Sequence, residues 1–359
     1  MNIEALFGTD PYSLNQKEKL ELMSKHLVRL TQRHYFKCWQ YKKIIDGMGV
    51  NIKVGSRLED IPFLPVRVFK IFELRSVPEK EVVKTMVSSG TSGQEVSKIY
   101  LDKETSLNQS KALTKIVSSF VGSKRLPMLI VDSEDVLKDR NMFSARGAGI
   151  LGFSIFASKR EYMLDKEMRL DVRRIVNFIG QNQDKKILLF GFTFMIYQHF
   201  IQEIERNKVE LDLSNSVLIH GGGWKKLSSL AITPEQFNLK LNQLCQIKSV
   251  HDYYGMVEQT GSIYMECEHG HLHASIFSDI IIRRSHDFSV APKGEIGIIQ
   301  TLSILPSSYP GHSLLTEDEG VLLGEDDCPC GRLGKYFKVL GRVKNAEIRG
   351  CSDAYAEQF

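Results

Sequence analysis

The chain has 359 residues, of which 42% are hydrophobic and 25% are charged. This composition is typical of a soluble globular protein and excludes a disordered or collagen-like chain. The length is sufficient for one large domain or two domains with a substantial core. A formal net charge of +4 is too small to indicate a polyanionic partner, so we do not expect nucleic-acid binding.

The first residues lack the basic start and apolar run of a signal peptide. No apolar segment reaches the roughly 18 residues that a membrane-spanning helix needs. The six cysteines are sparse and are not spaced as a disulfide framework. We therefore expect a cytoplasmic protein without a membrane span.

The hydrophobic pattern predicts three successive kinds of structure. Residues 15–47 carry apolar side chains at three- and four-residue intervals and are predicted to be helical, and Pro62 and Pro65 then break the pattern. The middle of the chain alternates short apolar strands with helices, which indicates a largely parallel α/β sheet. The predicted strands are 128–131, 187–190, 217–219 and 247–250, and the predicted helices between them include 168–179 and 194–206.

From about residue 276 the chain becomes rich in β-branched residues and turns. The segments 280–283, 296–302 and 337–340 are predicted to be antiparallel strands. The fold class is therefore α/β, with mostly parallel sheets flanked by helices and a β-rich subdomain after them.

The segment Ser88-Ser89-Gly90-Thr91-Ser92-Gly93 interleaves small hydroxyl side chains with glycines. Such a segment lets backbone amides and hydroxyls converge on phosphate oxygens. It is not a Walker motif, because no Gly-Lys-Ser/Thr sequence closes it. A flexible turn of no special function has the same composition, so the pattern alone leaves both interpretations open.

Three further loops carry candidate nucleotide ligands. The glycines of His220-Gly221-Gly222-Gly223 follow a predicted strand and allow a flat ligand close to the backbone. In Tyr254-Gly255-Met256-Val257-Glu258 the aromatic ring offers a stacking face and the carboxylate a ligand for a hard cation. In Thr316-Glu317-Asp318 the aspartate can accept both hydroxyls of a ribose. Each segment taken alone is equally compatible with an ordinary turn or a solvated acidic loop.

The order and spacing of these four segments resemble those of the adenylate-forming superfamily. Within it the chain is most similar to the acyl-protein synthetases, with phenylacetate–CoA ligases as near relatives, and the resemblance extends from Ile61 to Ser352. It implies the large N-terminal domain of those enzymes. Only 359 − 344 = 15 residues follow Lys344, so we expect the small C-terminal domain of most members to be absent.

The resemblance implies ATP-dependent and Mg²⁺-dependent activation of a carboxylic acid, which we expect to be a fatty acid, as an acyl-adenylate. It assigns Ser88, Ser89, Gly90, Thr91, Ser92 and Gly93 to the phosphates, Gly222, Gly223, Tyr254 and Gly255 to the nucleotide base, Asp318 to the ribose and Glu258 to Mg²⁺. Lys98 or Arg342 is expected to supply positive charge. The implied division is an N-terminal helical region at 1–60, a nucleotide- and acyl-binding core at 61–275, a β-rich subdomain at 276–340, and a hinge remnant and tail at 341–359.

The chain also departs from the pattern of the superfamily. Glu317 stands where glycine is usual, and Lys344 where the hinge usually has an acidic residue. The arginine that often precedes the ribose aspartate is absent. A non-catalytic nucleotide-binding relative is therefore an alternative to an enzyme.

Cys351, in Arg349-Gly350-Cys351-Ser352, is a candidate acyl acceptor. A thiol in a glycine-flanked tail can act as a nucleophile, and the nearby arginine favours its thiolate. By resemblance, Cys351 receives the acyl group from the adenylate and passes it to a partner such as a reductase. The alternatives are coenzyme A or a carrier-protein thiol as acceptor, with Cys351 an ordinary tail cysteine.

Cysteine and histidine side chains from two distant segments indicate a structural zinc site. Cys267, His269, His271 and His273 lie close together in the sequence, and Cys328 and Cys330 follow later. Two pairs of such ligands make a closed tetrahedral site. Phenylacetate–CoA ligases carry a similar Cys-x-Cys-Gly-Arg segment. We expect Cys267, His273, Cys328 and Cys330 to be the ligands, while the choice of histidine stays open.

Overall fold

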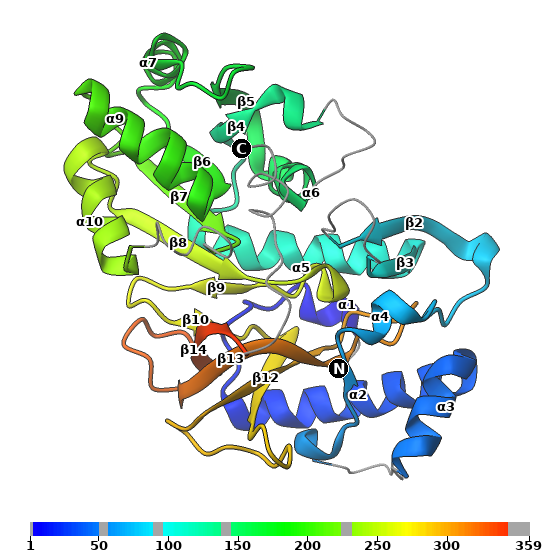
Figure 1. The fold of residues 1–359 in the computed structure, drawn as a ribbon. Coiled ribbons are helices and arrows are strands. Elements are labelled where there is room, and N and C mark those ends of the chain that lie inside the picture. Colours follow the sequence, from blue (N-terminus) through cyan, green and yellow to red (C-terminus); the bar gives the residue numbers. More distant parts are fainter. Residues whose placement is uncertain (1–2, 50–56, 89–95, 138–144, 224–231, 344–359) are drawn as a thin grey trace. The chain divides into compact units, whose positions relative to one another are not determined.

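The computed structural model describes residues 3–49, 57–88, 96–137, 145–223 and 232–343 (Figure 1). The chain forms two compact units, which are treated separately below. Unit 1 comprises residues 1–88, 93–120 and 254–347, and unit 2 comprises residues 89–92, 121–253 and 348–359. Among the described helices, none has the length and apolar character needed to cross a membrane. The four-segment division expected from the sequence stays a prediction.

Unit 2 is built on a parallel sheet with the strand order β5-β4-β6-β7-β8. Its strands are β4 (Leu126–Ser133), β5 (Ala157–Leu164), β6 (Ile187–Phe192), β7 (Ser216–Gly221) and β8 (Ser249–Tyr254). Helices α6 (Ala145–Phe153), α7 (Val172–Gly180), α8 (Thr193–Met195), α9 (Gln202–Asn207) and α10 (Pro234–Cys245) lie between or after them. Strands β6 and β7 are buried throughout, as continuous apolar runs in parallel sheets are. The predicted parallel α/β sheet is confirmed.

The sheet of unit 1 is antiparallel, in the order β11-β12-β13-β14-β10-β9. Its strands are β9 (Tyr264–Glu266), β10 (Leu272–His273), β11 (Ser278–Arg283), β12 (Ile296–Ser303), β13 (Ser313–Glu325) and β14 (Lys335–Arg342). The antiparallel strands expected after residue 276 are therefore present. A separate two-stranded sheet joins β2 (Val82–Val87) to β3 (Lys98–Asp102).

The acidic segment 316–319 is not a loop, as the sequence indicated, but the middle of the long strand β13. It pairs with β12 on one side and β14 on the other. Aspartate and glutamate are depleted in strands because most strand positions are half-buried or buried. The local pattern therefore predicted a solvated loop, and the pairing of two neighbouring strands decided otherwise.

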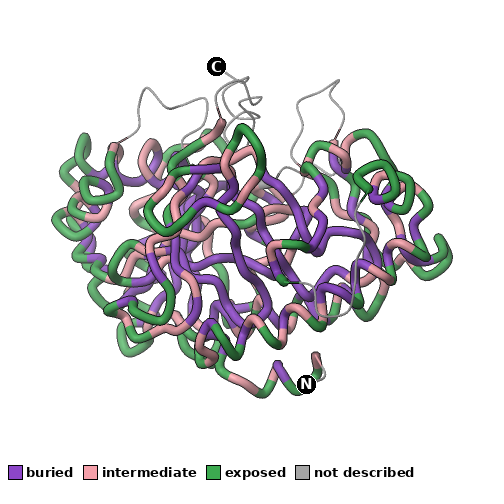
Figure 2. The backbone as a smooth tube through the Cα atoms, turned by 90° about the horizontal axis from the view of Figure 1, so that it is seen from below, coloured by how far each residue is buried: buried purple, intermediate pink, exposed green. Residues whose placement is uncertain are grey.

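The predicted N-terminal helix is present but consists of two helices in unit 1, α2 (Gln16–Lys37) and α3 (Trp39–Met48) (Figure 1). A capping box formed by Asn15 and Glu18 begins α2. The break lies at Cys38, whose backbone is extended at φ −121° and ψ 104°. Buried positions run along the strands, whereas many exposed positions lie on the helices and connections (Figure 2).

A buried charged group attaches α2 to the sheet of unit 1. Lys19 is only 1% exposed, and its Nζ donates to the carbonyl of Ala274 at 3.0 Å and lies 3.9 Å from the carboxylate of Asp279. Lys335 approaches the other oxygen of Asp279 at 3.6 Å. Burial lowers the pKa of Lys19 to about 8, although the charge of Asp279 opposes this shift. Asp279 is therefore the counter-charge that the two lysines share, as a buried charge requires.

His312 gives the fold a defined sensitivity to acid. The Thr31 hydroxyl donates to the carbonyl of Leu27 at 2.8 Å, so it accepts from Nε2 of His312 at 2.9 Å. The other ring nitrogen of His312 is buried without a hydrogen-bond partner, and burial lowers the pKa of this histidine to about 3. Below about pH 6.5 the unfolded chain takes up a proton that the folded chain cannot bind, so stability falls with decreasing pH.

We expect His312→Gln to reduce the slope of unfolding free energy against pH between pH 6 and pH 4, by about 1.4 kcal/mol per pH unit. Urea unfolding at a series of pH values measures this slope. His286→Gln is the matched control, because His286 has a side chain that is 72% exposed and should leave the slope unchanged. Equal slopes in wild type and His312→Gln would contradict the assignment.

Candidate nucleotide-binding and metal sites

Strand β1 (Leu64–Pro65) connects the segment 61–72 to β13 in unit 1. Leu64 pairs in parallel register with Leu314, and the amide of Val66 donates to the carbonyl of Leu315 at 2.9 Å. The short helix α4 (Val68–Ile71) therefore begins beside the acidic residues of β13. Arg67, at its N-cap, forms an ion pair with Glu317.

Asp318, the predicted ribose ligand, has partners on both carboxylate oxygens. The hydroxyl of Tyr254 donates to Oδ2 at 2.7 Å, and Nε of Arg342 lies 3.5 Å from Oδ1. Arg342 also donates from Nη1 to Glu317 at 3.1 Å. Burial raises the pKa of Tyr254 well above its usual value, and the charge of Asp318 raises it further, so the phenol remains a hydrogen-bond donor. The structure thus brings three predicted site residues together.

Glu258, the predicted Mg²⁺ ligand, lies in a short 3₁₀ turn at Val257–Gln259 and is only 6% exposed. The hydroxyl of Tyr309 donates to its backbone carbonyl at 2.9 Å and so holds the turn in place. Burial raises the pKa of the Glu258 carboxyl, while the nearby Ser97 hydroxyl and the charge of Lys70 lower it, and Glu317 raises it. Glu258 therefore lies close enough to Lys70 of α4 and to Glu317 of β13 for both charges to act on its carboxyl group.

Two hydrogen bonds join Ser88 and Ser97, which flank the serine- and glycine-rich segment. The amide of Ser88 donates to the carbonyl of Ser97 at 3.0 Å, and the amide of Ser97 donates to the hydroxyl of Ser88 at 2.9 Å. Because Ser97 also acts on Glu258, the base of this segment and the carboxylate are neighbours in unit 1. Residues 89–93 lie outside the described residues. Lys98 begins β3, opposite Val87, with an exposed side chain.

The glycines assigned to the base of the nucleotide are placed in different surroundings. Gly222 belongs to unit 2, where a Cβ atom would lie 2.6 Å from the ring of Phe192. Gly223 has a positive φ of 59° with open space around its Cα. Gly255 belongs to unit 1, where a Cβ atom would lie 3.0 Å from Ile263. Residue 222 must therefore be a glycine, because the ring of Phe192 occupies the space that a side chain would need.

The sequence did not identify three residues that the structure brings to Glu317 and Glu258, namely Arg67, Lys70 and Ser97. Arg67 and Lys70 lie three residues apart and share one face of the α4 turn. The available signal was the segment 61–70, which resembles the acyl-protein synthetases but carries no recognisable ligand pattern. Their role depends on the pairing of β1 with β13, which the local sequence does not encode.

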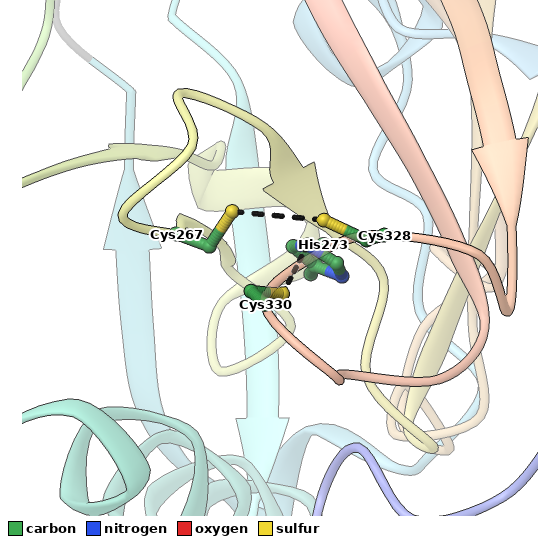
Figure 3. Close-up of side chains that lie close together, drawn as sticks. All are labelled: Cys267, His273, Cys328 and Cys330. Carbon is green, nitrogen blue, oxygen red and sulfur yellow. Dashed lines mark hydrogen bonds between the residues drawn. The ribbon is translucent and has the colours of Figure 1, made fainter.

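The second cluster in unit 1 consists of Cys267, His273, Cys328 and Cys330 (Figure 3). One donor atom from each residue lies within 4.8 Å of all the others. The sulfur atoms of Cys267 and Cys328 are 4.0 Å apart, and Nε2 of His273 lies 3.4 Å from the sulfur of Cys330. Ligands at about 2.0–2.3 Å from a tetrahedral zinc ion have similar mutual separations. The structure therefore brings the four predicted ligands together.

The surroundings favour the ligand forms of these side chains. Burial lowers the pKa of His273 to about 4, which keeps the imidazole neutral. Although burial opposes it, hydrogen bonds from Arg332 lower the pKa of the Cys330 thiol. His271 also approaches the cluster, with Nδ1 at 3.3 Å from the sulfur of Cys328, and its ring stacks on Tyr336 at 4.9 Å.

Comparison with known proteins decides the family. The sequence matches the family model described as "Acyl-protein synthetase, LuxE" over residues 2–359. The chain belongs to this family. It is also 23% identical, over 365 aligned positions, to a long-chain-fatty-acid–luciferin-component ligase of Vibrio harveyi, covering 99% of this chain and 93% of that protein.

Solved structures of adenylate-forming ligases share the fold. An open conformation of 2-hydroxyisobutyryl-CoA ligase in complex with 2-HIB-AMP and CoA aligns with a TM-score of 0.69 and 14% identity, over 98% of this chain and 83% of the other. Apo MatB from Rhodopseudomonas palustris aligns with a TM-score of 0.50 and 14% identity, over 76% and 50% of the two chains. The predicted fold class and the resemblance to acyl-protein synthetases are both confirmed. The protein is an adenylate-forming ligase, which activates an acid as an acyl-adenylate and then transfers the acyl group.

Proposed function

We propose that this acyl-protein synthetase activates a fatty acid with ATP and Mg²⁺ and transfers the acyl group to the thiol of Cys351. The observation that carries the nucleotide site is the contact of Tyr254 and Arg342 with the two oxygens of Asp318. The Vibrio harveyi relative, which is named for a long-chain fatty acid, supports the choice of acid. Cys351 itself lies outside the described residues.

In the first step a carboxylate oxygen of the acid attacks the α-phosphorus of ATP, and pyrophosphate leaves as the acyl-adenylate forms. Both reactants are anions, so the catalytic problem is the approach of like charges, and fixed positive charge near the reacting atoms lowers this barrier. Lys70, Arg67 and Arg342 are the cations that stand around Glu258 and β13. We assign them to the phosphate groups together with Lys98.

The remaining assignments rest on the resemblance of the sequence segments to those of adenylate-forming enzymes. Asp318 is assigned to accept hydrogen bonds from the ribose hydroxyls, while Glu317 holds Arg342 beside it. The buried carboxylate of Glu258 suits a hard cation, because Mg²⁺ prefers oxygen ligands, and a bound Mg²⁺ would neutralise charge on the phosphates. By the same resemblance, residues 88–93 are assigned to the phosphates, and Tyr254, Gly222, Gly223 and Gly255 to the base.

We further propose that Cys267, His273, Cys328 and Cys330 bind one structural zinc ion. Three thiol groups and one neutral imidazole match the ligand sets of closed zinc sites. The ligands come from the connection between β9 and β10, from β10 itself and from the connection between β13 and β14. A metal ion there would join these segments of unit 1 and would hold β10 and β14 in register.

Acid-dependent exchange of labelled pyrophosphate into ATP tests the first step. We expect exchange with fatty acids and expect chain length to change its rate. Absence of exchange with a panel of aliphatic and aromatic acids would contradict the proposed function. A parallel reaction with coenzyme A, in which free acyl-CoA is measured, distinguishes a thioester released to a small thiol from one retained on the protein.

Intact-mass analysis tests the second step. After incubation with ATP and a fatty acid, the wild-type mass should rise by one acyl group, and Cys351→Ser should show no increase while its pyrophosphate exchange persists. Cys38→Ser is the matched control, because Cys38 is a buried thiol that should not affect the adduct. An acyl adduct of equal amount in Cys351→Ser would reject Cys351 as the acceptor.

A further inference from the structure

A stripe of positive charge runs along the exposed face of α2 in unit 1, although the net charge of the whole chain is only +4. Its members are Lys25, Arg29, Arg33 and Lys37, all exposed and spaced four residues apart. At 1.5 Å per residue the stripe is about 18 Å long. We refer to these four residues as the basic stripe.

The acidic residues of α2, Glu18 and Glu21, both lie before the basic stripe, and Glu21 is one turn from Lys25. Like charges four residues apart destabilise a helix, and within the described residues no ion pair involves any of the four. Lys42 on α3, by contrast, is paired with Asp46 at 2.8 Å. The dipole of α2 favours cations only in the last turn, so it accounts for Lys37 and leaves Lys25 and Arg29 without a structural reason.

Two large aromatic side chains stand beside the basic stripe. Phe36 is 78% exposed and Trp39 is 62% exposed. Phe36 lies three residues after Arg33 and so shares the face of the stripe, and Trp39 is the first residue of α3. The ammonium group of Lys43 lies 4.6 Å from the centre of the Trp39 ring. Basic side chains therefore neighbour both rings, Lys43 at Trp39 and Arg33 one turn before Phe36.

We propose that this surface, the basic stripe with Phe36 and Trp39, binds an anionic lipid membrane. Lysine and arginine are attracted to anionic headgroups, and tryptophan and phenylalanine insert their rings at the level of those headgroups. An acidic protein would satisfy the charges, but it would leave two isolated, strongly exposed rings without a function. The inference is independent of the proposed acyl acceptor, and it places the enzyme at a surface where acids with long apolar chains are concentrated.

Trp39 provides a direct probe, because the chain contains only two tryptophans. In a Trp224→Phe variant, Trp39 is the only emitting tryptophan. We expect its emission to shift to shorter wavelength with vesicles of phosphatidylcholine and phosphatidylglycerol at 3:1, and to remain unchanged with phosphatidylcholine alone. The shift should disappear in 0.5 M salt, because salt screens exposed charges. No shift with the anionic vesicles would overturn the proposal.

Charge-neutral variants test the basic stripe. Lys25→Gln/Arg29→Gln/Lys37→Gln should lower the affinity for the anionic vesicles, measured by co-sedimentation, by at least about tenfold; Arg33 is kept because it donates to the carbonyl of Ser307 at 2.9 Å. The matched control is Lys124→Gln/Lys166→Gln/Lys185→Gln, which makes the same change in net charge at exposed positions outside α2 and α3 and should bind as wild type does. Equal losses in the two triple variants would reject a specific surface.

The aromatic pair distinguishes a membrane from an acidic protein. Phe36→Ser/Trp39→Ser should abolish vesicle binding, whereas it should leave any binding of poly-glutamate intact. If poly-glutamate binds through the stripe and vesicles do not bind, the partner is an acidic protein and the membrane proposal is wrong. Pyrophosphate exchange without vesicles should be the same as in the wild type in the charge-neutral and the aromatic variants, which separates a failure of this proposal from a failure of the proposed function.

Discussion

Glu258→Gln should reduce acid-dependent pyrophosphate exchange by about 100- to 1000-fold, the range found when one electrostatic group is removed from an active site. Glu258 is 6% exposed, and a glutamine of the same shape retains the packing while it removes the negative charge that is proposed to bind Mg²⁺. Burial disfavours the ionised form of this carboxyl and so raises its pKa. The neutral amide should therefore leave the free energy of unfolding unchanged or raise it.

Opposite effects on activity and stability are what make this substitution informative. A residue that serves only the fold would lose both together. Glu104→Gln, at an exposed position of α5 (Lys103–Val121), is the matched control and should retain full exchange. Wild-type exchange in Glu258→Gln, at any Mg²⁺ concentration, would exclude Glu258 from the cation site.

Cys328→Ser should remove bound zinc and lower the free energy of unfolding by at least about 3 kcal/mol. Structural zinc contributes roughly 10–16 kcal/mol in small zinc-dependent domains, and the expected loss is smaller here because the strands of unit 1 also hold the connected segments. Metal analysis of the purified protein should find one zinc ion per wild-type chain. Urea unfolding measures the loss of stability.

Metal removal provides an independent test of the same site. A chelator should destabilise the wild type to the level of Cys328→Ser, and added zinc should restore the wild type but not the variant. Cys245→Ser is the matched control, because Cys245 is buried in α10 and lies outside the cluster. Protein that is metal-free as purified, and equally stable with and without the chelator, would contradict the zinc proposal.

Glu317, which departs from the usual glycine of the superfamily, has a structural explanation. Its carboxylate is held between Arg67 of the α4 segment and Arg342 at the end of β14. A glycine would leave these two guanidinium groups without their shared counter-charge. Glu317 therefore fixes the positive charge that we assign to the phosphates.

The sequence by itself determined the family, the parallel and antiparallel parts of the fold and the three cysteines of the cluster, with His273 preferred among three nearby histidines. These features rest on local signals. Apolar runs such as 187–190 identify buried strands, and the spacing of Cys267 and His273 from Cys328 and Cys330 identifies a ligand set. The segments around Tyr254 and Asp318 were informative for the same reason, because each carries its chemistry within a few residues.

Only the tertiary structure decided that residues 316–319 belong to a strand, that the N-terminal helix breaks at Cys38, and that Arg67 and Lys70 stand beside Glu317 and Glu258. Each of these depends on contacts between segments far apart in the chain, such as the pairing of β1 with β13. Non-local pairing overrides local propensity wherever it buries more surface or satisfies more backbone groups. The basic stripe likewise became visible only when burial showed which face of α2 is turned away from the core.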